Sequence, residues 1–249
     1  MLIPPPSPET RCRLEWGRRG AAAAAARGDI LVVVDVLSFS SAVVTAVEMG
    51  GMVYPCAEEE SPVARAEDVG GVAAVHRGRV PKEGRYSLSP LSFLDLPCGE
   101  RVVLASPNGA TCCRHAGEAA LIICGALLNR SAVAERLGIL LGESDRGVSI
   151  VAAGERWEDP AEEGQLRFAI EDYLGAGAII AALDVVKTAE ADLAGAAFDS
   201  VAERIAEMLH TCDSGRELHQ KGYASDVEHA ARVDLYRCVP VLIDGRFTE

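Results

Sequence analysis

Four places in the sequence put polar side chains directly after a short apolar run that is typical of a strand. In parallel α/β sheets, ligands bind at the carboxyl ends of strands, where loops meet helix N-termini with free N–H groups. These junctions are therefore the first candidates for a binding site, although each Ser, Thr or Asn there is equally explained as an ordinary helix cap. Their polar residues are Asp35, Ser38, Ser40 and Ser41; Asn108, Gly109 and Thr111; Asn129, Arg130 and Ser131; and Glu155 and Arg156.

Carboxylates at or near these junctions point to metal chemistry. Asp35 ends an apolar run, where a carboxylate costs free energy unless a donor or a cation meets it. Glu171 and Asp172 interrupt an apolar helical stretch, and since consecutive helix positions point about 100° apart, only one can face a buried site squarely. If any three of the four carboxylates Asp35, Glu155, Glu171 and Asp172 converge, they would suit Mg²⁺. This ion takes hard oxygen ligands and keeps some waters for a substrate. The alternative is that Glu171 and Asp172 are solvated charges on a helix surface.

Two covalent mechanisms are alternatives. Cys124 and Arg130 have the spacing of a thiol phosphatase, after a strand and before a helix, but the loop between them lacks the glycines that let amides close around a phosphate. Asp35 begins a segment similar to an aspartyl-phosphate motif, but Leu37 stands where such enzymes place a second Asp. We therefore rank an aspartyl-phosphate on Asp35 above a Cys124 phosphoenzyme, and both below direct attack by water.

The elements that must position these residues alternate between strand and helix. This alternation predicts an α/β fold, with helices layered on both faces of a largely parallel or mixed sheet. Residues 1–28 are expected to be an N-terminal arm ending in a short helix or strand, and residues 29–249 the α/β region, with an internal division into two halves considered near 140–147. The predicted strands are 30–34, 52–55, 102–105, 121–124, 148–153 and 236–243. The predicted helices are 40–49, 61–68, the segment from the 106–109 turn to about 119, 131–137, 163–183, 192–209, 214–222 and 225–234.

Composition excludes several classes of protein. The 37 acidic against 24 basic residues give a formal charge of −13, which repels nucleic acid and favours divalent cations. The apolar stretches are too short to span a bilayer, and residues 1–9 do not resemble a secretory signal, so a cytoplasmic protein without membrane contact is expected. Eight cysteines without a C-x-x-C pair argue against a disulfide scaffold or a zinc ribbon.

Six segments, taken together, resemble the 2-phosphosulfolactate phosphatase family in order and spacing. The resemblance implies a Mg²⁺-dependent phosphatase that acts on phosphates of 2-hydroxycarboxylic acids, with 2-phospho-3-sulfolactate, an intermediate of coenzyme M biosynthesis, as the family's named substrate. It runs from about residue 30 to 246. The segments are 32–41 (VVVDVLSFSS), 106–110 (SPNGA), 124–132 (CGALLNRSA), 153–157 (AGERW), 170–179 (IEDYLGAGAI) and 222–234 (GYASDVEHAARVD).

The resemblance also implies roles for individual residues. One position departs from the family: Ser38 stands where an Arg commonly follows the Asp-Val-Leu motif, and a guanidinium is the natural partner of phosphate, carboxylate or sulfonate. The residues that match family motifs are Asp35, Asn108, Gly109, Asn129, Glu171, Asp172, Asp226 and Asp234. The arginines that could replace the missing one are Arg77, Arg79, Arg130, Arg156 and Arg216.

These observations predict a hydrolase that binds a small anionic phosphomonoester. Helix N-termini near Ser40 and Asn108 are expected to bind phosphate oxygens, and Asp35→Asn to cost orders of magnitude in rate while leaving the fold intact. The rival hypothesis is a non-catalytic or repurposed small-anion-binding protein on the same scaffold, and a homodimer is expected because symmetric dimers are common. The predicted catalytic residues are Asp35, Glu155 and Asp172; the substrate-binding residues are Ser38, Ser40, Ser41, Asn108, Gly109, Asn129 and Arg156; and the metal ligands are Asp35, Glu171 and Asp172.

Overall fold

A computed structural model describes residues 10–117, 121–157 and 166–249. Its centre is β2 (Ile30–Val34), in which every side chain is buried. Parallel neighbours β7 (Val148–Ala152) and β6 (Ile122–Cys124) flank this strand. An all-apolar strand is expected where helices cover both faces of a sheet.

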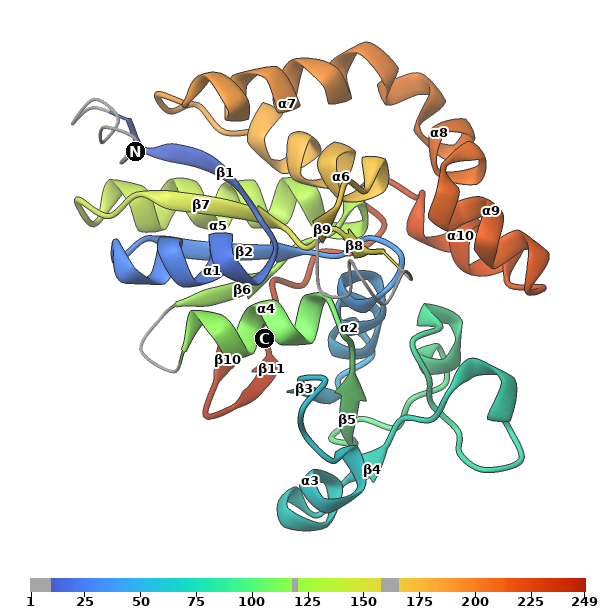
Figure 1. Cartoon of the computed structure of the whole chain (residues 1–249). Coiled ribbons are helices and arrows are strands. Elements are labelled where there is room, and N and C mark those ends of the chain that lie inside the picture. The colour runs from blue at the N-terminus through green and yellow to red at the C-terminus, as the bar shows by residue number, and fades with distance from the viewer. Residues whose placement is uncertain (1–9, 118–120, 158–165) are drawn as a thin grey trace.

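Within the described residues, nine strands form one mixed sheet in the order β1-β7-β2-β6-β10-β11-β3-β5-β4 (Figure 1). The pairs on either side are parallel, and an antiparallel hairpin of β10 and β11 joins the two parallel parts. This architecture confirms the predicted α/β class with a mixed sheet. The remaining strands of the sheet are β1 (Cys12–Trp16), β3 (Met52–Cys56), β4 (Val72–Ala73), β5 (Arg101–Ala105), β10 (Val241–Ile243) and β11 (Arg246–Thr248).

Helices cover both faces of the sheet (Figure 1). Leu31 and Val33 of β2 pack into a core with α1, α2 and α4, whereas Ile30, Val32 and Val34 pack into a second core with α5, α6 and α7. Alternating side chains of one strand thus serve two cores. The helices are α1 (Gly17–Ala26), α2 (Phe39–Glu48), α3 (Pro62–Val69), α4 (Gly109–Ala116), α5 (Arg130–Gly142), α6 (Ile170–Ala181), α7 (Ala189–Val201), α8 (Ile205–Thr211), α9 (Asp213–Gln220) and α10 (Ala224–Ala230).

Several predicted boundaries differ from the structure. The strand predicted at 236–243 is only 241–243, and β11 was not predicted. The helix predicted from 163 begins at Ile170, because Leu166–Arg167 form strand β9 and pair with β8 (Glu155–Arg156). The predicted start at 163 lies outside the described residues. The helix predicted at 192–209 is divided into α7 and α8.

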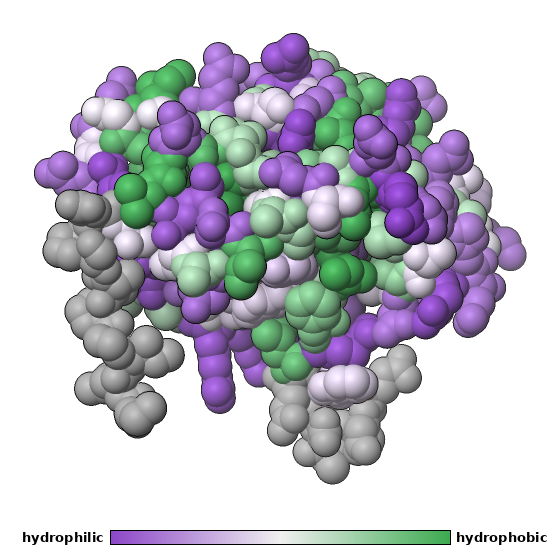
Figure 2. Space-filling model, turned by 90° about the horizontal axis from the view of Figure 1, so that it is seen from above, coloured by the Kyte–Doolittle hydropathy of each residue, from purple (hydrophilic) through white to green (hydrophobic). Residues whose placement is uncertain are grey.

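Residues 12–26, part of the predicted arm, form β1 and α1, and β1 pairs with all five residues of β7. The internal division considered near 140–147 stays a prediction; β7, which follows that segment, lies between β1 and β2 in the sheet. None of the helices in the described part of the chain combines the length and apolar character needed to cross a bilayer. Figure 2 looks onto the α7 side of the molecule, where hydrophilic side chains separate the apolar groups. The homodimer stays a prediction.

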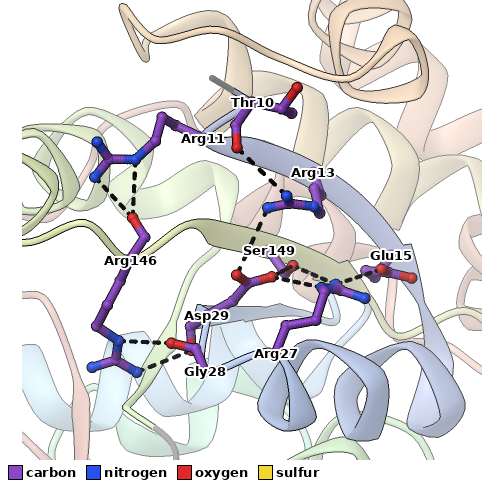
Figure 3. A network of polar contacts seen from close by, with 9 residues as sticks. All are labelled: Thr10, Arg11, Arg13, Glu15, Arg27, Gly28, Asp29, Arg146 and Ser149. Atoms are coloured by element: carbon purple, nitrogen blue, oxygen red, sulfur yellow. Dashed lines mark hydrogen bonds and ion pairs between the residues drawn. The ribbon is translucent and has the colours of Figure 1, made fainter. Parts of the chain in front are cut away.

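A polar network joins the first residues of β1, β2 and β7 (Figure 3). Its centre is Asp29, which is buried and directly precedes β2. The Asp29 carboxylate accepts hydrogen bonds from Arg27 Nε at 3.0 Å and Ser149 Oγ at 2.7 Å, and Arg13 lies 3.7 Å away. Arg27 also pairs with Glu15 at 2.6 Å. This network ties three strands together at the end of the sheet opposite their loops to the helices.

Asp29→Asn is expected to lower the free energy of unfolding by about 2 kcal/mol, because a buried charged acceptor is replaced while its cationic partners remain. Urea denaturation would measure the change. The control is Glu207→Gln, which removes an exposed ion pair with Arg204 and should leave the midpoint unchanged. A midpoint for Asp29→Asn equal to that of the parent would show that the network does not stabilise the fold.

Candidate active site

A cavity of about 180 Å³ opens where β2, β5 and β7 end. Three of the predicted strand-end loops reach it, and the segment around Arg77 and helix α9 provide its other walls. Figure 1 shows α9 and α10 at this end of the sheet. The lining residues that carry polar groups are Asp35, Ser38, His76, Arg77, Ser106, Asn108, Glu155, Ser214, Glu217, Lys221 and Tyr223.

Asp35 joins the N-termini of two helices. Its Oδ1 accepts the N–H of Phe39 in α2 at 3.1 Å, and its Oδ2 accepts the N–H of Gly109 in α4 at 2.8 Å. Ser106 Oγ donates to Oδ2 at 3.3 Å. Helix N-termini favour negative charge, so these donors explain how a buried carboxylate is tolerated. Two N–H groups that the sequence analysis assigned to a phosphate are therefore bound by Asp35.

Burial outweighs these donors and raises the pKa of Asp35, and the neighbouring charge of Glu171 raises it further. Gly109 is required beside this carboxylate, because a Cβ there would lie 2.8 Å from Asp35 Oδ2 and would collide with the Phe39 ring. The Asn-Gly turn thus provides a close approach that only glycine permits.

Asp172 fixes the loops that follow β2 and β7. Its two carboxylate oxygens accept the N–H groups of Val36 at 2.7 Å and Gly154 at 2.9 Å. Burial, followed by the charges of Asp35 and Glu171, raises its pKa well above the usual range of an Asp. Glu171 and Asp172 are each only 3% exposed, so the alternative of solvated helix charges is wrong for both. The geometry shows Asp172 as a positioning residue rather than one that lines the cavity.

Glu155 and Asn108 form one wall of the cavity. Asn108 Nδ2 donates to Glu155 Oε2 at 3.0 Å, and the Arg156 N–H donates to the same oxygen at 3.3 Å. Burial, and then the charge of Asp35, raise the pKa of Glu155 to about 7. Glu155 can therefore hold or release a proton near neutral pH, which is useful for acid–base chemistry.

Arg77 brings a guanidinium to Ser38. Its Nη2 donates to Ser38 Oγ at 2.6 Å and to the Leu88 carbonyl at 3.0 Å, and its Nε donates to Asp226 at 3.0 Å. The side chains of Arg77 and Asp226 are 14% and 3% exposed. The guanidinium also lies over the Tyr223 ring, 5.6 Å from its centre. Among the arginines considered as replacements for the one missing at 38, Arg77 is the one that lines this cavity.

The other considered arginines bind carboxylates elsewhere. Arg79 pairs with Glu83 at the surface, and Arg130 pairs with Asp234 at the start of α5. Arg156 pairs with Glu58, and Arg216 with Asp213. Their guanidinium groups are therefore held away from Ser38.

Some predicted substrate-binding residues do not line the cavity. Ser40 and Ser41 are fully buried and donate their hydroxyls to the carbonyls of Val33 and Val36. Asn129 is also fully buried; its side chain accepts the Ala126 N–H and donates to the Cys238 carbonyl. These three side chains bind backbone groups of neighbouring strands and loops. Ser40 and Ser41 lie within α2, and Asn129 makes no N-cap hydrogen bond to α5, so they are not the ordinary helix caps that the sequence left open as the alternative.

Cys124 does not suit a thiolate nucleophile. It is fully buried, and burial raises its pKa to about 12. A reactive thiolate needs the opposite shift. Arg130, its proposed partner, lies over the Phe198 ring and beside Asp234. The Cys124 phosphoenzyme is therefore excluded as a mechanism.

Several residues of the cavity were missed from the sequence. Ser106 directly follows β5, two residues before Asn108, so its position after a strand was a usable signal. Lys221 and Tyr223 come from the end of α9 and the turn after it. Since they follow no strand, only the packing of α9 and α10 brings them to the cavity.

The residues of the site fit a magnesium ion only if oxygens of the substrate complete its coordination. In the described part of the chain, no three His, Cys, Asp or Glu side chains are arranged to hold an ion together. Both oxygens of Asp35 and both of Asp172 already accept N–H groups. Mg²⁺, however, is commonly held by one or two carboxylates, waters and substrate oxygens. The hard oxygens of Asp35 at the cavity suit that arrangement.

Comparisons with known proteins show which family the chain resembles. A family model described as 2-phosphosulpholactate phosphatase matches residues 20–245. A protein of Methanothermobacter thermautotrophicus named 2-phosphosulfolactate phosphatase is 31% identical over 219 residues, which cover 87% of this chain and 88% of the relative. Proteins named probable 2-phosphosulfolactate phosphatase are 29% identical in Thermotoga maritima (87% and 90% covered) and 30% identical in Carboxydothermus hydrogenoformans (84% and 84% covered). The chain therefore belongs to the 2-phosphosulfolactate phosphatase family, a family of phosphoric monoester hydrolases.

Proposed function

We propose that the chain is a Mg²⁺-dependent phosphatase of a 2-phospho-hydroxycarboxylic acid such as 2-phosphosulfolactate. One observation carries the proposal. The buried Arg77 guanidinium and the Asp35 carboxylate line the same small cavity at the carboxyl ends of the strands. Phosphoryl transfer needs mainly positioning and charge neutralisation, and this pairing of a guanidinium with a carboxylate supports both.

We assign phosphate binding to cationic and hydroxyl side chains of the chain itself. Arg77 and the Ser38 hydroxyl, already 2.6 Å apart, face one oxygen-binding position. Lys221 lines the same cavity. Bidentate guanidinium contacts suit a phosphate dianion, and their strength grows in a buried site.

A magnesium ion bound beside Asp35 would polarise a phosphoryl oxygen and neutralise negative charge. Asp35 orients toward the cavity because the first turns of α2 and α4 hold it. Asp172 keeps the neighbouring loops in place. Because both Asp35 oxygens accept hydrogen bonds, we assign attack to water and keep an aspartyl-phosphate as the second mechanism.

Glu155 is proposed as the general acid that protonates the departing alkoxide of the hydroxy acid. Its Oε2 accepts two N–H groups, so the proton resides on Oε1. An alkoxide is a poor leaving group, and a carboxyl with a pKa of about 7 carries a proton in a useful fraction of molecules at neutral pH.

This role predicts a pH dependence. Since the protonated form of Glu155 is the active one, kcat should fall as the pH rises through about 7. Glu155→Gln should lower kcat by about 100-fold and remove this descending limb. Steady-state phosphate release from the parent and from Glu155→Gln, measured between about pH 5 and 9, would test this pH dependence of kcat. A limb that persists in Glu155→Gln would assign the proton to another group.

A substrate panel tests the proposed function. Phosphate release would be followed for 2-phosphosulfolactate, 2-phospholactate and glycerol phosphate at saturating Mg²⁺. The expected result is turnover of the 2-phospho-hydroxy acids in preference to glycerol phosphate. Absence of turnover by the folded protein would favour the rival hypothesis of a small-anion-binding protein. The cytoplasmic location, the lack of nucleic-acid contact and a role in coenzyme M biosynthesis stay predictions.

A further inference from the structure

A second and larger cavity, of about 570 Å³, adjoins the candidate active site. Pro107, Asn108 and Glu155 line both cavities. The far side of the larger cavity is formed by Trp16 and the first residues of α1. Its volume lies in the range of small-molecule sites, and its shared wall makes it an extension of the catalytic cavity.

Three arginines line this cavity: Arg18, Arg19 and Arg156. The Arg156 guanidinium is held by Glu58 and by the Pro107 carbonyl. Within the described residues, Arg18 and Arg19 form no ion pair or side-chain hydrogen bond, and Arg18 is half-buried. A protein with a net charge of −13 thus gathers cations at one cavity beside its candidate active site.

The position of Arg18 and Arg19 is unfavourable for the helix itself. Both belong to the first turn of α1, which contains no acidic residue, and Trp16 provides no side-chain cap. The helix dipole repels cations at an N-terminus and attracts anions. Two arginines in the first turn therefore lower the stability of the helix. Residues that lower local stability in this way are expected at functional sites.

The charges of this cavity reach the acidic cluster of the active site. Cys112 of α4 lines the cavity, and burial is the main reason that its pKa is raised to about 12. The charges of Asp35 and Asp172 raise this pKa further, whereas those of Arg156 and Arg18 lower it. Cys112 therefore lies within range of both the arginines of this cavity and the two carboxylates.

We propose that the larger cavity is a subsite for a further anionic group, a carboxylate or sulfonate, on the carbon of the substrate where 2-phospholactate carries its methyl group, with Arg18 as the main cation. The inference rests on the proposed function, because the phosphate occupies the smaller cavity and the scissile oxygen lies at the shared Asn108–Glu155 wall. A guanidinium fork matches the oxygens of either anion. The subsite selects substrates whose tail is anionic and disfavours a methyl group at that position.

Calorimetric titration with 3-sulfolactate, the product without phosphate, tests the subsite independently of turnover. Arg18→Met is expected to weaken binding by about 10- to 100-fold. Arg18→Lys, which keeps the charge without the fork, should lie between Arg18→Met and the parent. The matched control is Arg136→Met, on the exposed surface of α5, which should bind as the parent does. Equal affinity in the parent and both Arg18 variants, or no binding to the parent, would overturn the subsite.

Kinetics separate this inference from the proposed function. Arg18→Met should lower kcat/KM for 2-phosphosulfolactate by about 10-fold or more, and that for 2-phospholactate by less than about 3-fold. An equal loss for both substrates would overturn the subsite while leaving the phosphatase intact. If the parent released no phosphate but bound 3-sulfolactate through Arg18, the proposed reaction would be contradicted, whereas the subsite would be supported.

Discussion

Asp35→Asn is expected to lower kcat for phosphate release by about 10³-fold, because it removes the carboxylate charge around which the cavity is built. The substitution keeps the size of the side chain, so the loss would report charge and not shape. Steady-state phosphate release, normalised to folded protein, would measure it. Activity within a few-fold of the parent would contradict the assignment of Asp35.

The hydrogen bonds of Asp35 add a cost in stability to the expectation for this variant. An Asn side chain has one acceptor oxygen, whereas Asp35 accepts from Phe39, Gly109 and Ser106. The amide nitrogen would face an N–H donor at one of the two helix N-termini, with a cost of about 1–3 kcal/mol in the free energy of unfolding. We therefore expect the variant to fold with a lower free energy of unfolding than the parent.

Asp29→Asn is the matched control for this cost. Asp29 and Asp35 directly precede and follow β2, and both are buried acceptors. Both substitutions should destabilise the protein, but Asp29→Asn should keep kcat within about 2-fold of the parent because Asp29 lies at the opposite end of the strand. A similar loss of kcat in both variants would mean that stability, and not chemistry, explains the Asp35 result.

Arg77→Met is expected to lower kcat/KM by about 100-fold, because it removes a buried charge-assisted contact to phosphate. The loss should appear in both KM and kcat, since the guanidinium neutralises charge in the bound and the reacting phosphate. Steady-state kinetics with 2-phosphosulfolactate would measure both constants.

Arg79→Met is the matched control for Arg77, since both residues belong to the same short helical turn, η1 (Arg77–Arg79). Arg79 is exposed and pairs only with Glu83 among the described residues, so its loss should change kcat/KM by less than about 2-fold. Asp226→Asn, which leaves Arg77 in place but weakens its anchor, should have an intermediate effect. Equal activity of Arg77→Met and Arg79→Met would show that Arg77 does not bind the phosphate.

Local sequence patterns predicted the elements that dominate this fold. The strand at 30–34 and the helix near 40–49 were recognisable because apolar runs and Gly-Gly boundaries are local features. Strands β1, β9 and β11 were not predicted as such; β1 pairs with the distant strand β7, whereas β9 and β11 pair antiparallel with the nearby strands β8 and β10. The residues of β1 do alternate between apolar and polar (CRLEW), so a usable signal was overlooked there, whereas β9 and β11, with two and three residues, are too short to show a pattern.

The candidate site was predictable where strands end and unpredictable where helices fold over it. Asp35, Asn108 and Glu155 follow strands, and the rule that ligands bind at carboxyl strand ends was sufficient to find them. The same rule also selected Ser40 and Asn129, which are buried and bind backbone groups inside the fold, because the same residue types serve structural and binding roles. Arg77 was one of several candidates, and only its buried pair with Asp226 identifies it.

The metal dependence of the proposed reaction is tested by phosphate release from 2-phosphosulfolactate, measured with excess Mg²⁺ and again after EDTA. We expect turnover with Mg²⁺, its loss in EDTA and its recovery when Mg²⁺ is restored. Turnover that EDTA leaves unchanged would contradict the role of the metal beside Asp35. No phosphate release in either condition, from protein shown to be folded, would contradict the assignment of this cavity as a phosphatase active site.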